Sequence, residues 1–295
     1  MRGTVDGFSH GLITPVIAYL MACLGGALGL RCTTRSVRDR GTFRPGWLAL
    51  GATSIGAGIW TMHFIAMTGF TIAEAPVDYD RPVTFASLAV AILMVGIGIF
   101  IVGHRGATAM ALVTGGTITG LGIATMHYLG MAGMRVQGRL EYDTVTVALS
   151  VVIAVVAATS ALWAAVSVHG FLPSVVASLV MGLAVSGMHY TGMAAVRVHL
   201  HTDATVEALR PAGDTATSLL APMLVGPVLF LLLAAVVVMR DPLLVTGGHD
   251  GPGTAHAATR RPGIPAPRDG RAHDAGAGGF ARPGAARRDT WSRDR

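Results

Sequence analysis

The chain has 295 residues, of which 52% are hydrophobic and only 13% are charged, and its mean hydropathy is +0.58. A soluble domain usually carries about 25% charged residues, so this composition excludes an ordinary soluble protein. The formal net charge is +6. The arginines that carry it lie between the long apolar runs and after the last of them, which favours anionic lipid over nucleic acid as the partner of this charge.

Seven apolar runs follow one another along the chain. A helix that spans a bilayer needs about 20 predominantly apolar residues, and the interiors of all seven runs lack Asp, Glu and Arg. The runs cover residues 12–30, 47–70, 84–103, 108–134, 145–168, 172–197 and 217–239. The sequence therefore predicts an all-α fold, a polytopic transmembrane bundle of seven helices in the lipid bilayer.

The charges between the runs predict the orientation of the bundle. Short cytoplasmic loops carry an excess of basic residues. The segment after the first run holds five arginines against Asp39 alone: Arg31, Arg35, Arg38, Arg40 and Arg44. The next segment and residues 198–216 are more acidic than basic. This pattern places the N-terminus outside and the C-terminus in the cytoplasm.

The composition changes beyond the seventh run. Residues 241–295 are rich in Gly, Pro, Ala, Arg and Asp and contain few large apolar side chains. Such a segment cannot bury enough apolar surface to offset the entropy of ordering it. We therefore expect a transmembrane domain at 1–240 and a disordered cytoplasmic tail at 241–295.

A Met-His motif, with a second Met four residues after the His, ends the second, fourth and sixth runs. The three copies read Met62-His63-Phe64-Ile65-Ala66-Met67, Met126-His127-Tyr128-Leu129-Gly130-Met131 and Met188-His189-Tyr190-Thr191-Gly192-Met193. A fixed spacing of this kind indicates an internal repeat. We expect three helical hairpins whose second helices carry the motif near the outer membrane face, plus one extra helix.

The repeated residue types favour a soft metal ion. A His and the Met four residues later lie on one face of a helix, so His63 can share a ligand with Met67, and the other copies likewise. Imidazole and thioether groups together suit copper, above all Cu(I). Zinc more often recruits Cys or carboxylate ligands, and calcium and magnesium prefer oxygen ligands. We also expect Tyr128 and Tyr190 to bond a ligand or anchor the interface, and His10, His199 and His201 to lie in solvated loops.

At these residues the sequence resembles the MHYT-domain integral membrane proteins, a family named after the motif Met-His-Tyr-Thr. The third copy, Met188-His189-Tyr190-Thr191, matches letter for letter, and the resemblance covers about residues 10–240. It implies a sensor module of the bacterial inner (plasma) membrane that binds copper near the outer face and senses a diatomic gas such as O2, CO or NO. The metal ligands that it implies are Met62, His63, Met67, Met126, His127, Met131, Met188, His189 and Met193.

Many members of that family continue into a cytoplasmic diguanylate cyclase, phosphodiesterase or histidine kinase domain. The expected tail of this chain is too short and too polar for such a domain, so the resemblance implies a separate cytoplasmic signalling protein as partner. The sequence offers no catalytic residue set, and we expect no enzyme. Two alternatives stay open, namely transport or handling of copper or protons, and binding of haem, for which His and Met are known axial ligands.

Overall fold

The computed structural model describes residues 5–6, 11–38, 45–72, 77–136, 138–168, 170–200 and 216–240. Seven helices in this part of the chain are long and apolar enough to cross a membrane, which confirms the predicted bundle. They are α1 (Ile13–Arg38), α2 (Pro45–Thr68), α3 (Arg81–Arg105), α4 (Ala109–Ala132), α5 (Thr144–Ser167), α6 (Phe171–Ala194) and α7 (Ala216–Arg240). The predicted tail at 241–295 lies outside the described residues.

The first helix is longer than its apolar run. It continues to Arg38, so Arg31 and Arg35 belong to its last turns and not to the loop in which the charge pattern placed them. The hydroxyls of Thr33 and Thr34 donate to backbone carbonyls one turn back in the same helix. Arginine is favoured here because it interacts well with the negative end of a helix dipole and can extend its charge toward the membrane surface.

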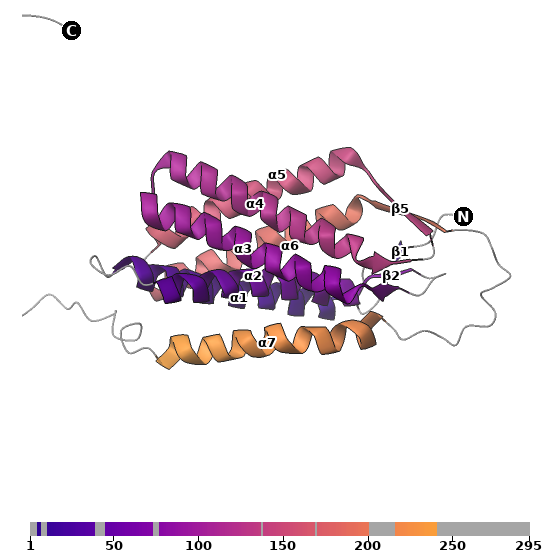
Figure 1. The fold of residues 1–295 in the computed structure, drawn as a ribbon, viewed down its shortest axis with the longest axis horizontal. Helices are drawn as coiled ribbons and strands as arrows, with labels where there is room; N and C mark the ends of the chain where they lie inside the picture. Colours follow the sequence, from indigo (N-terminus) through magenta and orange to yellow (C-terminus); the bar gives the residue numbers. More distant parts are fainter. Residues whose placement is uncertain are drawn as a thin grey trace, which may run out of the picture. The chain divides into compact units, whose positions relative to one another are not determined.

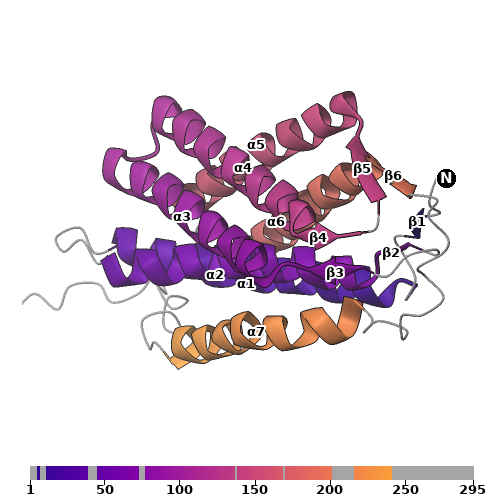
Figure 2. The same ribbon diagram turned by 45° about the vertical axis from the view of Figure 1, so that its right-hand side comes forward.

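Six short strands, which the sequence analysis expected as loops, lie at one end of the bundle (Figures 1 and 2). They are β1 (Val5–Asp6), β2 (Thr71–Ile72), β3 (Asp78–Tyr79), β4 (Met134–Arg135), β5 (Gly138–Tyr142) and β6 (Val196–Leu200). Each helical hairpin starts and ends in a strand, and its two strands pair antiparallel. The repeat is therefore a strand–helix–helix–strand unit that closes on itself. We call this end of the bundle the strand end.

An aspartate joins strand to helix in the second and third units. Asp80 caps α3 by accepting a hydrogen bond from the Val83 N–H, and its own N–H donates to a carbonyl in the turn after α4. Asp143 caps α5 in the same way. The cap bond and the ion pair with Arg135 hold the pKa of Asp80 below its usual value. The two caps satisfy backbone groups at the helix starts and fix where α3 and α5 leave the strand end.

The first six helices form a closed ring in chain order, because each contacts the next and α6 contacts α1. α7 packs outside this ring against α1 and α2 and lies beside them in Figure 2. The glycines of α1 and α2 allow close contact, since a methyl group on Gly25 would lie 2.7 Å from Gly58 Cα. Small residues promote such contacts in membranes, where apolar surfaces gain little by association alone.

Candidate metal centre

The three motif histidines meet inside the ring of helices. His63 on α2, His127 on α4 and His189 on α6 are each at most 1% exposed. Their Nδ1 atoms form a triangle: 3.1 Å from His63 to His189, 3.2 Å from His63 to His127, and 3.3 Å from His127 to His189. The second helices of all three hairpins therefore present one shared constellation at the strand end, and not three separate sites.

Hydrogen bonds among three neutral imidazoles cannot give every Nδ1 atom of the triangle a suitable partner. A neutral ring carries one N–H, so each Nδ1 is either a donor or an acceptor. If all three protons reside on Nε2, three Nδ1 lone pairs face one another. If one ring carries its proton on Nδ1, this N–H can donate to one neighbouring Nδ1. The other two Nδ1 atoms are then both acceptors and still face each other. A cation shared by the three nitrogens removes this conflict.

The spacing of the nitrogens fits a metal ion. Three imidazole nitrogens about 2.0–2.1 Å from one ion, at near-tetrahedral angles, lie about 3.3–3.4 Å apart, close to the observed 3.1–3.3 Å edges. Among the His, Cys, Asp and Glu side chains of the described residues, these three form the group with metal-binding geometry. Imidazole suits copper, zinc, iron and nickel, so the histidines alone do not select one of these metals.

Glycines of the motif itself hold two of the rings. A methyl group on Gly130 would lie 2.6 Å from His63 Nε2, and one on Gly192 would lie 2.4 Å from His127 Nε2. Each glycine follows its own histidine by three residues and packs against the histidine of another helix. Both of these Nε2 atoms are buried without a hydrogen-bond partner. The sequence analysis missed these glycines; the signal was the small residue, Ala66 in the first copy, at one position of all three motifs.

The six motif methionines share the core of the bundle with the histidines. Met62, Met67, Met126, Met131 and Met188 are at most 1% exposed, and Met193 is half-buried and packs against the same apolar cluster. Their burial agrees with either interpretation, a packed side chain or a sulfur ligand. The three imidazole nitrogens lie close enough together to share one ion.

The residue after the second motif histidine links two neighbouring hairpins. The Tyr128 hydroxyl forms a 2.6 Å hydrogen bond with the Ser150 hydroxyl on α5. In the first copy Phe64 stands in this position and has no hydroxyl. Ser87 on α3 instead accepts a 3.0 Å bond from the Trp60 indole N–H. Tyr128 therefore serves the join between hairpins, and a tyrosine at this position is not needed in every copy.

Of the three histidines expected in loops, the structure describes His199, which is not part of the candidate metal group. His199 lies in strand β6, not in a loop as expected, because β6 pairs with β5 along its length. Its Nε2 is 3.3 Å from a carboxylate oxygen of Glu141 on β5. His10 and His201 lie outside the described residues. The shared centre thus consists of the motif histidines.

A buried triangle of imidazoles at one end of seven membrane-spanning helices defines the class: a multi-pass membrane protein with a candidate metal centre. Residues 56–115 and 120–178 match the family model described as MHYT, a bacterial signalling protein N-terminal repeat. The chain therefore carries MHYT repeats, which confirms the family resemblance. The two matched segments contain the first and second motifs, and the third motif follows them.

Several curated signalling proteins are similar to this chain. A bifunctional diguanylate cyclase/cyclic di-GMP phosphodiesterase, MucR of Pseudomonas aeruginosa, is 36% identical over 197 residues, 65% of this chain and 29% of the relative. The cyclic di-GMP phosphodiesterase NbdA of the same organism is 36% identical over 61% of this chain and 24% of its own length.

The signaling protein YkoW of Bacillus subtilis is 31% identical over 62% of this chain and 24% of its own length. The chain thus spans less than a third of the length of the relatives described. No solved structure matches it. These similarities support a membrane module of bacterial signalling proteins, and the activities named for the relatives are those of the relatives.

Proposed function

We propose that this chain is a sensory module of a bacterial plasma membrane that binds one copper ion at the histidine triangle. The observation that carries the proposal is the mutual approach of three buried Nδ1 atoms, which leaves their lone pairs without a satisfactory arrangement unless a cation is bound. The imidazoles of His63, His127 and His189 would hold the ion. The bound ion would supply a position at which a small ligand can coordinate.

Copper is the metal we favour, because six thioethers surround the imidazoles. Thioether sulfur is a soft ligand of the kind that suits Cu(I). Met67, Met131 and Met193 lie one helical turn after their histidines on the same helix face, and Met62, Met126 and Met188 reach the cluster from the flank. We propose that one sulfur of the first three serves as a weak fourth ligand, which a small ligand can replace, and that the second three complete the apolar surroundings of the ion.

The signal that we propose is a diatomic gas such as O2, CO or NO. The ion would lie at the strand end, which the arginine pattern places toward the outside. The helices that hold the ion run to the opposite end of the bundle, where a cytoplasmic partner can detect a change in their packing. Transport of copper or protons is less well supported, because Ile59, Ile123 and Val185 form an apolar layer one turn below the histidines.

The first test is metal analysis of the purified full chain after loading with Cu(I) under reducing conditions. We expect one copper per chain. Each of the single variants His63→Ala, His127→Ala and His189→Ala should lose it, since one shared site needs all three rings. The matched control is His104→Ala. It changes an exposed histidine near the C-terminal end of α3, away from the strand end, and this variant should bind copper normally.

The sulfur contribution is tested by X-ray absorption spectroscopy of the copper-loaded protein. We expect sulfur as well as nitrogen scattering, and loss of the sulfur scattering in the triple variant Met67→Leu, Met131→Leu, Met193→Leu. Three copper ions per chain, with two retained in each single His variant, would refute the shared centre. Absence of copper from the correctly folded wild-type protein would refute the proposed function.

A further inference from the structure

A small internal cavity lies below the histidine triangle. Its volume is about 40 Å³, and it is lined by residues of all six ring helices. Ile59, Ile123 and Val185 line it, and each stands four residues before the histidine of its own helix. Residues eight positions before the three histidines, such as Thr119, line it as well. The cavity therefore begins one helical turn below the candidate metal centre, on the inner faces of the same three helices.

The lining of this cavity offers water few hydrogen-bond partners. Two of its residues carry hydroxyls, and both hydroxyl protons are already used: Thr33 donates to the Gly29 carbonyl at 2.9 Å, and Thr119 donates to the Met94 carbonyl at 3.3 Å, which leaves these oxygens as acceptors only. The other lining side chains are aliphatic or Met. A water molecule in a cavity needs several polar partners, and apolar cavities stay dry and take up apolar guests such as xenon.

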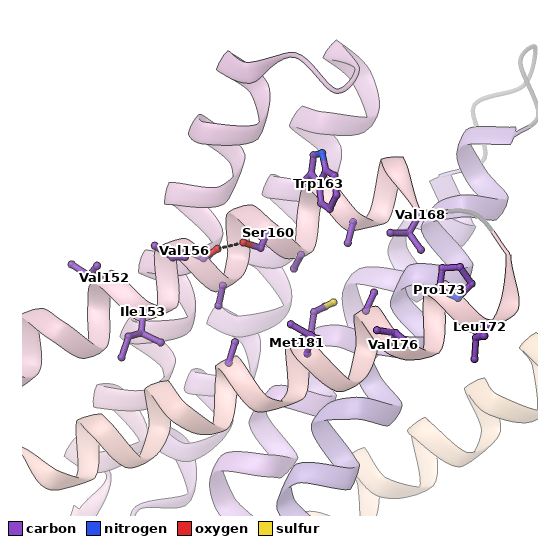
Figure 3. Close-up of a pocket in the computed structure, with 16 residues that line it drawn as sticks. Val152, Ile153, Val156, Ser160, Trp163, Val168, Leu172, Pro173, Val176 and Met181 are labelled. Carbon is purple, nitrogen blue, oxygen red and sulfur yellow. Dashed lines mark hydrogen bonds between the residues drawn. The ribbon is translucent and has the colours of Figure 1, made fainter.

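A second, larger space lies between this cavity and the bilayer and is open to the bilayer. A groove of about 720 Å³ runs between α5 and α6, and its walls are almost entirely apolar (Figure 3). Large side chains along it, including Val156 at 59% exposed and Val180 at 60%, face outward, as lipid-facing residues do. Lipid therefore has access to this groove along the membrane-spanning part of both helices.

Three residues belong to both spaces. Ala157, Ala161 and Met181 line the internal cavity as well as the groove. The wall between them thus consists of two methyl groups and one unbranched, flexible thioether side chain. Methionine adapts its conformation readily because it has three rotatable bonds. Of the three shared side chains, Met181 is therefore the one that can change its conformation to let a small guest pass.

We propose that the internal cavity is the docking site of a diatomic apolar gas, which enters from the bilayer through the α5–α6 groove. This inference rests on the proposed function for its biological meaning. The cavity selects by size and polarity, since it holds one small molecule and offers it no free hydrogen-bond donor. Among the residues that line the cavity, Ile59, Ile123 and Val185 stand one helical turn from the histidines of their own helices.

Xenon is the probe for the cavity, because it is apolar, of suitable size and independent of any metal. Crystals of the full chain, pressurised with xenon, should show an atom among Ile59, Ile123 and Val185. The variant Ala161→Leu places a larger α5 side chain between the groove and the cavity, and it should lose the xenon site. Ala157→Leu is a second variant with the same expected result. The matched control Ala184→Leu changes a residue that lines the groove and not the cavity, and should keep the xenon site.

The metal-free variant His127→Ala keeps this test separate from that of the proposed function. Xenon in the cavity of this variant and in the wild type would support the docking site even if copper binding fails. Ordered water in the cavity, or xenon binding that is unchanged in both Ala157→Leu and Ala161→Leu, would overturn it. In copper-loaded protein we expect CO to rebind more slowly after flash photolysis in Ala161→Leu than in the wild type; equal rates would overturn the route through the groove.

Discussion

The first and third hairpins follow the same strand–helix–helix–strand plan but pack in opposite ways. Five residues before its histidine, the first hairpin has Gly58, whose added methyl would lie 2.7 Å from Gly25 Cα. At the same position the third hairpin has Ala184, which lines the open groove between α5 and α6. The first hairpin is also covered by α7, whereas the third faces outward.

This difference shows which part of the repeat is constrained. The hairpins differ in how tightly their two helices pack, yet the three Nδ1–Nδ1 distances agree within a narrow range of 3.1–3.3 Å. Threefold regularity is therefore strict where the three units meet and relaxed away from that point. The tight hairpin gives the centre a rigid side, and the open hairpin gives it a side that small apolar molecules can approach.

The largest effect is expected where the tight hairpin is forced apart. Gly58→Leu places a large side chain against the α1 backbone, and we expect it to cost about 1–3 kcal/mol of unfolding free energy, since overpacking a close contact displaces backbone. Ala184→Leu extends into the groove and should stay within about 0.5 kcal/mol of the wild type. Unfolding in detergent, followed by circular dichroism, compares the two. Similar losses in both variants would contradict the difference between the hairpins.

A smaller effect, on copper affinity, is expected from the motif glycines at the point where the three hairpins meet. Gly130→Ala and Gly192→Ala should each push a ring of another helix, His63 or His127, out of the triangle. We expect copper affinity to fall about 10–100-fold, as it does when the groups that orient metal ligands are changed, with the helical fold retained. Competition with a Cu(I) chelator measures the affinity.

The control for Gly192→Ala lies on the same helix, α6. Gly187→Ala adds a methyl group where no atom lies within 4 Å, so its copper affinity should match the wild type. The first motif already carries Ala66 at the equivalent position. If Gly192→Ala binds copper as tightly as Gly187→Ala does, the close packing of glycine on imidazole does not orient the ring, and the centre is less rigid than the distances indicate.

The sequence predicted the helices and the repeat because both depend on local pattern. Long runs without Asp, Glu or Arg can only be accommodated as spans, and motif spacing located the three histidines on helices that run in the same direction. It could not predict whether His63, His127 and His189 share one site, because this depends on how closely α2, α4 and α6 approach. It also missed the short strands, which are stabilised by pairing between segments such as Asp78–Tyr79 and Met134–Arg135, far apart in sequence.

The smallest effect concerns the joins between hairpins. Ser150→Ala leaves the Tyr128 hydroxyl without its 2.6 Å partner, and we expect a loss of about 0.5–1 kcal/mol, in the range measured for hydrogen bonds within membranes. Ser87→Ala should cost less, because the Trp60 N–H also lies 3.2 Å from the Thr84 carbonyl and keeps this acceptor. The double variant Ser150→Ala, Tyr128→Phe should recover part of the loss, since it removes both partners. A larger loss for Ser87→Ala than for Ser150→Ala would mean that the first join, where Phe64 replaces tyrosine, depends on its serine more than the second join does.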